Sequence, residues 1–301
     1  MIGGNLVFEI FEIIAPIFVV AALGFLFEKR GPSFDSTTLS RLALWIGTPC
    51  LVFSSLTNTA LPDEALARMI GITFAVAVLG GALAFLALAL FRLPQRTFLS
   101  PLALPNAGNA GLPVVFFTFS DAGLAIGAAF FFVIALVQYT VVPMVVSGEL
   151  GLRKLLKEPL IWTVLAVIGF RVADVAPPKI IADTTALLGG MMIPVMLILL
   201  GGALARLRVK DIATSILLAM LRLAIGLATG LSMVFLFGLD GIEAGAVFLM
   251  SAMPSALVTY VISQHYGREP ERVAAFVVSS TVLNFLCLPV LIAAALHIAA
   301  L

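Results

Sequence analysis

Residues 104–115 read LPNAGNAGLPVV and lie inside a segment that is otherwise apolar enough to cross a membrane. Proline removes a backbone donor and clashes with the preceding helical turn, and glycine is a weak helix former. In hydrocarbon every freed backbone group needs a partner, so an interrupted span is tolerated only where it is buried in protein or lines a cavity. The stretch therefore predicts a binding site inside a membrane protein, formed by Asn106, Gly108, Asn109, Gly111 and Pro113.

The whole chain has the composition of a polytopic membrane protein. Of its 301 residues, 62% are hydrophobic and 11% are charged, and the mean hydropathy is +1.18. Soluble domains average roughly 45–50% apolar and about 25% charged residues. The net charge of +1 provides no basic field for a nucleic acid. With about 20 residues needed per span, ten apolar segments are expected at 8–28, 38–58, 67–91, 97–119, 122–147, 159–174, 180–205, 212–238, 242–265 and 273–299.

Basic residues predict which side of the membrane each connection faces, because cytoplasmic loops carry an excess of Lys and Arg. The bias is satisfied when both termini lie outside, and it leaves Arg222 within the eighth span. We therefore expect a multi-pass protein of the inner (plasma) membrane with both termini outside. The inner connections then hold Lys29, Arg30, Arg41, Arg92, Arg96, Arg153, Lys154, Lys157, Arg206, Arg208, Lys210, Arg268 and Arg272, and the outer ones hold Arg68, Arg171 and Lys179.

Prolines and polar residues recur at an offset near 145, which predicts two repeats of five spans each. An odd number of spans inverts the second repeat, an arrangement typical of secondary transporters with discontinuous helices. The expected fold is all-α, with ten transmembrane helices in two inverted repeats, 1–147 and 159–301, joined by an inner segment at 148–158. The matched pairs are Pro49 with Pro194, Pro113 with Pro254, Pro143 with Pro289, and Gln138 with Asn284.

The repeat predicts a second broken helix in the ninth span, around Ser251, Pro254 and Ser255. As the partner of the fourth span it forms half of a crossover at the middle of the membrane. Half-helix N-termini, each with about half a positive charge, then point into one cavity. Such a cavity favours an anion.

Each candidate residue also has a plain structural interpretation. The two asparagines of the first break either contact substrate or cap the broken helix. The two glycines either approach a ligand or permit close helix packing. Arg222 either attracts an anionic substrate or snorkels towards the inner loop. Three further pocket candidates are mid-span polar residues, which often only bridge helices or bond to the backbone: Gln138, Asn284 and Ser55.

These motifs resemble the auxin efflux carrier family, which includes the plant PIN carriers and bacterial permeases for malonate and other organic acids. LPNAGNAGLP is similar to the first crossover of that family, and AMPSALVTYVISQHYGREP is similar to the second. The resemblance implies a transport domain (spans 3–5 and 8–10), a scaffold (spans 1, 2, 6 and 7) that commonly dimerises, and a pocket lined by Asn106. Ser255 and Ala256 stand where the plant carriers have Gln-Gly, which favours a small bacterial substrate over auxin.

The resulting hypothesis is a secondary transporter for a small organic anion, such as malonate, malate or an auxin-like acid. It would be a homodimer in the lipid bilayer and work by an elevator form of alternating access. An anion channel, a sodium-coupled organic-acid symporter and a ligand-sensing receptor are the alternatives. The sequence contains no motif of an enzyme, a metal site or a cofactor site. All sixteen Asp and Glu residues lie at span ends or in loops, which argues against a simple proton relay, whereas sodium can be held by backbone and side-chain oxygens.

Overall fold

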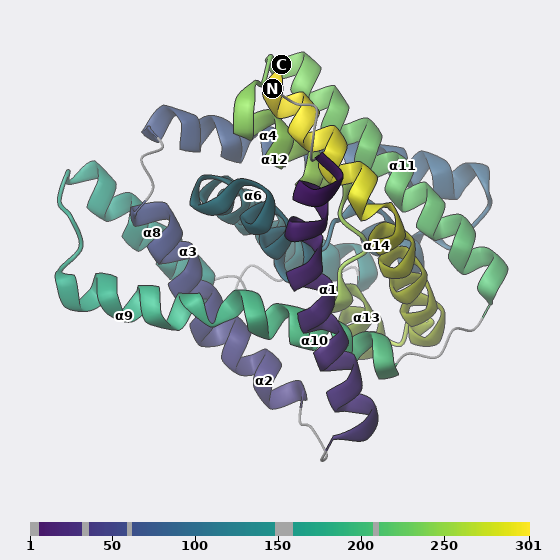
Figure 1. The fold of residues 1–301 in the computed structure, drawn as a ribbon. Coiled ribbons are helices and arrows are strands. Elements are labelled where there is room, and N and C mark those ends of the chain that lie inside the picture. The colour runs from purple at the N-terminus through teal and green to yellow at the C-terminus, as the bar shows by residue number, and fades with distance from the viewer. Residues whose placement is uncertain (1–5, 32–35, 59–61, 148–158, 207–210) are drawn as a thin grey trace.

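The computed structural model consists of helices joined by short connections (Figure 1). It describes residues 6–31, 36–58, 62–147, 159–206 and 211–301, and no strand forms among them. The elements of the first half are α1 (Leu6–Arg30), α2 (Ser36–Leu42), the π-helix η1 (Ala43–Gly47), α3 (Thr48–Thr57), α4 (Asp63–Leu90), α5 (Gln95–Ala103), the π-helix η2 (Ala107–Gly111) and α6 (Leu112–Ser147). Those of the second half are α8 (Pro159–Val172), α9 (Lys179–Gly190), α10 (Met192–Arg206), α11 (Ile212–Phe237), α12 (Gly241–Ala252), α13 (Leu257–His265) and α14 (Pro270–Ala300).

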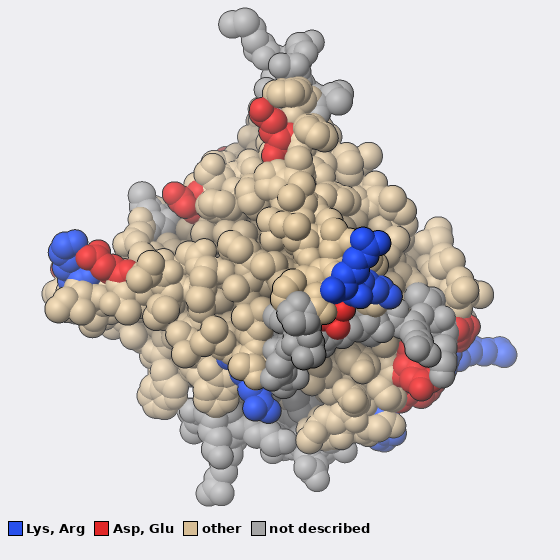
Figure 2. All heavy atoms as spheres, turned by 60° about the horizontal axis from the view of Figure 1, so that its bottom comes forward, with Lys and Arg blue, Asp and Glu red and all other residues tan. Residues whose placement is uncertain are grey.

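Six helical segments of the described chain are long and apolar enough to cross a membrane, which fits a polytopic membrane protein. Figure 2 shows one face of the molecule, on which uncharged residues dominate and the charged side chains are scattered. The ten segments expected from the sequence coincide with helical residues, but several consist of two short helices, so the number of spans stays a prediction. The six segments are Ile10–Arg30, Glu64–Leu90, Ala107–Val142, Lys179–Ala205, Ile212–Phe237 and Pro270–Ala300.

Four of the expected spans are not single uniform α-helices. In the second span η1 precedes α3, and in the seventh Met191 separates α9 from α10. Pro49 and Pro194 each fall in the first turn of the helix that follows, where the fixed φ of proline is compatible with a helix. The fourth and ninth spans are interrupted between α5 and η2 and between α12 and α13. Within α6, Ser120 has φ of 55° and separates two helical parts, at the expected boundary between the fourth and fifth spans.

Glycines allow α1 and α10 to pack closely where they cross in Figure 1. A side chain at Gly24 would overlap the carbonyl oxygen of Ile198, and one at Gly201 would overlap the carbonyl oxygen of Ala21. Small residues at such positions let helix backbones approach, which is a main source of helix association in membranes. The first and seventh expected spans are therefore held together by backbone contact.

Replacing Gly201 by Ala is expected to destabilise the protein by about 1–3 kcal/mol, because the added methyl group has no space against α1. The measurement is the midpoint of thermal unfolding in detergent. Gly71→Ala is the matched control, since Gly71 lies within α4 and an added methyl group there meets no atom within 4 Å. Equal midpoints for the two variants would contradict the assigned packing.

Candidate functional site

The first break lies at Leu104, Pro105 and Asn106, between α5 and η2. Leu104 adopts extended backbone angles, and the helix resumes only after Asn106. Oδ1 of Asn106 accepts a hydrogen bond of 3.1 Å from the backbone N–H of Asn109, so this side chain caps the resumed helix. Pro113, which we matched with Pro254, lies in the first turn of α6 beyond the break. That match is wrong, because the proline within the first break is Pro105.

The second break lies between α12 and α13, at Met253, Pro254, Ser255 and Ala256. Met253 and Ala256 both have ψ angles outside the helical range, so the chain is extended for about the same length as in the first break. All four residues are buried. The helical chain is therefore interrupted within the ninth expected segment, and the crossover of two broken spans stays a prediction.

The two breaks pair with each other. The backbone N–H of Asn106 donates a 2.7 Å hydrogen bond to the carbonyl oxygen of Pro254, and Pro105 and Ser255 form an antiparallel bridge. Backbone groups released from a helix need partners wherever water is excluded. Each break thus provides hydrogen-bond partners for some of the free backbone groups of the other. The ends of four helical segments meet at this place.

Two side chains of α14 complete the second break. Oγ of Ser280 accepts a 3.1 Å hydrogen bond from the backbone N–H of Ser255. Nδ2 of Asn284 donates a 2.8 Å hydrogen bond to the carbonyl oxygen of Ala252, the last residue of α12. Asn284 therefore lies beside the second break, where its amide bridges α14 and α12, and its role in a pocket stays a prediction.

Arg222 of α11 also reaches the breaks, and its side chain is 2% exposed. Nη2 donates a 2.7 Å hydrogen bond to the carbonyl oxygen of Ser251, and Nη1 lies 3.5 Å from that of Leu102. The snorkelling interpretation is therefore wrong, because the guanidinium bonds to backbone inside the protein. The sequence identifies a charge within a span, but its backbone partners depend on the tertiary structure.

Several buried polar atoms around the breaks have no hydrogen-bond partner among the described residues. Such atoms are rare in proteins, and each one calls for a ligand, a water molecule or an ion. Nδ2 of Asn106 and Nε of Arg222 are donors of this kind, and the oxygens are Oγ of Ser251, Oγ of Ser255 and Oδ1 of Asn284. The paired breaks thus combine two nitrogen donors with three oxygens, a set suited to a polar ligand.

The glycines of the first break serve close packing. An added Cβ at Gly108 would lie 2.9 Å from the ring of Phe131, and one at Gly111 would lie 2.7 Å from Sδ of Met250. Both glycines are buried, whereas Asn109 is half-buried. The packing interpretation accounts for the two glycines without a ligand.

Two of the expected pocket residues lie outside this hydrogen-bonded cluster. Gln138 is buried in the second part of α6, and its Nε2 has no partner among the described residues. Ser55 is half-buried on α3, and its neighbour Ser54 bonds back to the carbonyl oxygen of Leu51. The described contacts do not bring either residue to the paired breaks.

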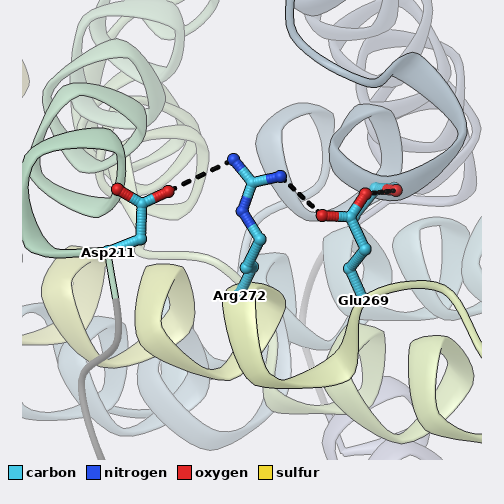
Figure 3. Close-up of polar contacts among 4 residues, drawn as sticks. Asp211, Glu269 and Arg272 are labelled. Atoms are coloured by element: carbon cyan, nitrogen blue, oxygen red, sulfur yellow. Dashed lines mark hydrogen bonds and ion pairs between the residues drawn. The ribbon is translucent and has the colours of Figure 1, made fainter.

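A charged cluster joins the starts of three helices (Figure 3). Arg272 of α14 lies between Asp211, which precedes α11, and Glu269, as Figure 3 shows. Oε1 of Glu269 accepts a 3.2 Å hydrogen bond from the hydroxyl group of Thr97 on α5. A hydrogen bond from Thr214 and the charge of Arg272 hold the pKa of Asp211 below its usual range. The cluster therefore ties α5, α11 and α14 together.

Three further contacts of basic residues join pairs of helices. Arg68 and Glu243 form an ion pair between the N-terminal parts of α4 and α12. Arg268 lies in the α13–α14 connection, and its Nη2 lies 3.4 Å from a carbonyl oxygen near the end of α6. Arg171 of α8 donates a 2.7 Å hydrogen bond to the carbonyl oxygen of Leu56 at the end of α3.

Comparison with known proteins gives one family and two relatives. The family described as membrane transport protein matches residues 9–150 and 140–292. An uncharacterized transporter of Methanothermobacter thermautotrophicus is 26% identical over 293 residues, which cover 92% of this chain and 96% of that protein. An uncharacterized transporter of Methanocaldococcus jannaschii is 24% identical over 271 residues, which cover 82% and 86%. The similarity thus extends over most of each protein.

Proposed function

The chain belongs to the membrane transport protein family, which is the auxin efflux carrier family, and on that premise we propose that it carries a small organic anion. The observation that supports this substrate class is the pairing of the two breaks, with Asn106 bonded to Pro254 across them. The η2–α6 segment and α13 both begin there, so their N-termini point towards the breaks. Each helix N-terminus carries about half a positive charge, so two of them favour a bound carboxylate.

The substrate would bind at the paired breaks and accept a hydrogen bond from a buried nitrogen that has no other partner among the described residues. Nδ2 of Asn106 is the best candidate donor, because Oδ1 of the same side chain is already used in capping. Ser251, Ser255 and Asn284 supply oxygens at the same place. Gln138 and Ser55 are retained as outer candidates, and Ser55, which lies on α3 of the proposed scaffold, would approach only as the transport domain moves.

Alternating access would move one group of helices past another. We assign α4, α5, α6 and α11 to α14 to the transport domain, and α1, α2, α3 and α8 to α10 to the scaffold. The hydrogen bonds and ion pairs described above join helices of one group only. Contacts between the groups include the rings of Phe18 on α1 and Phe285 on α14, whose centroids are 5.1 Å apart. An apolar interface of this kind permits sliding, which supports an elevator mechanism.

The membrane arrangement follows the sequence-based prediction of ten spans in two inverted repeats, with both termini outside. The start of α1 and the end of α14 lie at the same edge in Figure 1, which agrees with an even number of spans. The homodimer is proposed from the family resemblance. The accessibility of introduced cysteines in cells would test on which side of the membrane each terminus lies. A mass measurement of the protein in detergent would test whether it is a dimer.

Transport by purified protein in liposomes tests the proposed function. Uptake of radiolabelled malonate, malate and indole-3-acetate is measured at fixed membrane potentials. We expect at least one of the three to accumulate with saturation and to show counterflow, which a channel does not produce. Absence of protein-dependent uptake for all three would contradict this substrate class.

A sodium-coupled symporter is the second candidate, and the three unpartnered oxygens of Ser251, Ser255 and Asn284 favour it. Hard cations prefer oxygen ligands, including hydroxyl and amide groups. Under this mechanism, replacing external sodium by choline removes concentrative uptake. Under potential-driven transport, the same replacement leaves the rate unchanged and the rate follows the imposed potential instead.

A further inference from the structure

Arg222 occupies an unusual place for a charged side chain, at the ends of two different broken helices. It lies on α11 and is the largest of the fully buried side chains of the described chain. Its two terminal nitrogens approach the carbonyl oxygens of Ser251 and Leu102. Ser251 lies in the last turn of α12 and Leu102 in the last turn of α5.

The charge of Arg222 matches what these helix ends require. The last carbonyl groups of a helix have no partner within it, and together they carry about half a negative charge. Two such ends sum to about one negative charge, which one guanidinium compensates. The planar guanidinium also places separate donors on two acceptors, a geometry that an ammonium group lacks.

Glycines bring the two helix ends within reach of this residue. Gly226 lies one turn after Arg222, and a Cβ there would lie 2.5 Å from the carbonyl oxygen of Ser251. Gly80 of α4 has the same relation to the end of α5, since its Cβ would lie 3.2 Å from the carbonyl oxygen of Ala103. The residue one turn before Gly80 is the buried Val76. Only the second half of the chain has an arginine at this position, and that arginine contacts the helix ends of both halves.

We propose that Arg222 is a positioning residue, which holds the C-terminal ends of α5 and α12 at the paired breaks and compensates their negative charge. The positive N-termini of the η2–α6 segment and of α13 then determine the potential at the site. This inference rests on the proposed transport of an anion. The two terminal nitrogens of Arg222 bond to backbone on the side of the breaks where α5 and α12 end, so we expect Arg222 to act through these helix ends and not as a substrate ligand.

The experiment compares Arg222→Gln, Arg222→Lys and Arg171→Gln in liposomes, with the anion among malonate, malate and indole-3-acetate that the wild type carries. Arg222→Gln removes the charge, and Arg222→Lys keeps the charge but lacks the planar guanidinium that reaches two acceptors. Arg171→Gln is the matched control, since Arg171 bonds to a helix-end carbonyl of the scaffold, away from the breaks. KM, Vmax and the thermal unfolding midpoint are measured for each variant.

We expect Arg222→Gln to raise KM about tenfold, because an uncompensated negative charge then lies near the bound anion. Vmax should change much less, Arg222→Lys should recover most of the affinity, and Arg171→Gln should change the unfolding midpoint but not KM. A purely structural role would instead lower the amount of active protein at constant KM in both Arg222 variants. That result, or wild-type kinetics in Arg222→Gln, overturns the proposal.

An exchange variant, Val76→Arg with Arg222→Val, keeps the test decisive if Arg222→Gln does not fold. Position 76 has the same relation to Gly80 that position 222 has to Gly226, so an arginine there should reach both helix ends. We expect the exchange to restore folding and a KM near that of the wild type. An exchange variant that does not fold, or that folds with weak affinity, counts against the proposal. If the wild type carries none of the three anions, the proposed function fails, and the stability of the exchange variant still tests the bonding pattern.

Discussion

Asn106→Asp should abolish transport while leaving the protein folded. Asp retains the oxygen that caps the resumed helix by accepting from the N–H of Asn109, and a carboxylate at a helix N-terminus is favourable. The substitution exchanges only the other half of the side chain, where Nδ2 has no partner among the described residues. If that nitrogen donates to an anionic substrate, the exchange removes the donor and places a like charge against the ligand.

The expected loss is at least about 100-fold in Vmax/KM, since a hydrogen bond to a charged group contributes roughly 1.5–3 kcal/mol and charge repulsion adds to it. The measurement is initial uptake in liposomes, with the thermal unfolding midpoint recorded for the same preparation. Asn106→Ala provides the complementary variant, because it removes the cap as well and should lower both activity and the midpoint.

Asn109→Ala is the control for position. Asn109 takes part in the cap through its backbone N–H, which alanine keeps, and its side chain is half-buried. Its effect on transport should therefore be smaller than that of Asn106→Asp. Transport at the wild-type rate by a folded Asn106→Asp protein would remove Asn106 from the pocket and leave it a helix cap.

The position of the first break could be predicted from sequence because its chemistry is local. Proline and glycine disfavour a continued helix wherever they stand, and residues 104–115 are rich in both. The detail of the break could not be predicted in the same way. The chain leaves the helix only at residues 104–106, whereas Gly108 and Gly111 lie in a π-helix and Pro113 lies in the first turn of α6. Proline at a helix start is compatible with the helix, so its presence did not mark the break.

The contacts between the breaks depend on tertiary structure, and no local pattern encodes them. The bond from Asn106 to Pro254 joins residues that are far apart in the sequence. Hydropathy identified Arg222 as a charge within a span, but its partners are backbone carbonyls, which every residue has. One signal was present in the sequence, namely a glycine one turn after Arg222 (Gly226) and one turn after Val76 (Gly80). In the structure these two glycines lie against the ends of α12 and α5.

A cross-link between the two helix groups provides the second large effect. Phe18 on α1 and Phe285 on α14 face each other across the proposed sliding interface, with ring centroids 5.1 Å apart. In a background without the native Cys50 and Cys287, both of which are free thiols, the pair Phe18→Cys and Phe285→Cys can be joined by a short bis-thiol reagent. We expect the cross-linked protein to lose nearly all uptake, because the transport domain can no longer move past the scaffold.

A cross-link within one group separates this effect from simple chemical damage. Phe53 on α3 and Phe170 on α8 have ring centroids 6.0 Å apart, and both helices belong to the proposed scaffold. Phe53→Cys with Phe170→Cys, treated identically, should keep the uptake that it had before cross-linking. A reducible reagent adds a second check, since uptake through the first pair should return when the link is cleaved. If both links leave uptake intact, α1 and α14 do not move relative to each other during transport, and the elevator mechanism is wrong. If both links abolish it, the scaffold itself must change shape, which requires a different division of the helices.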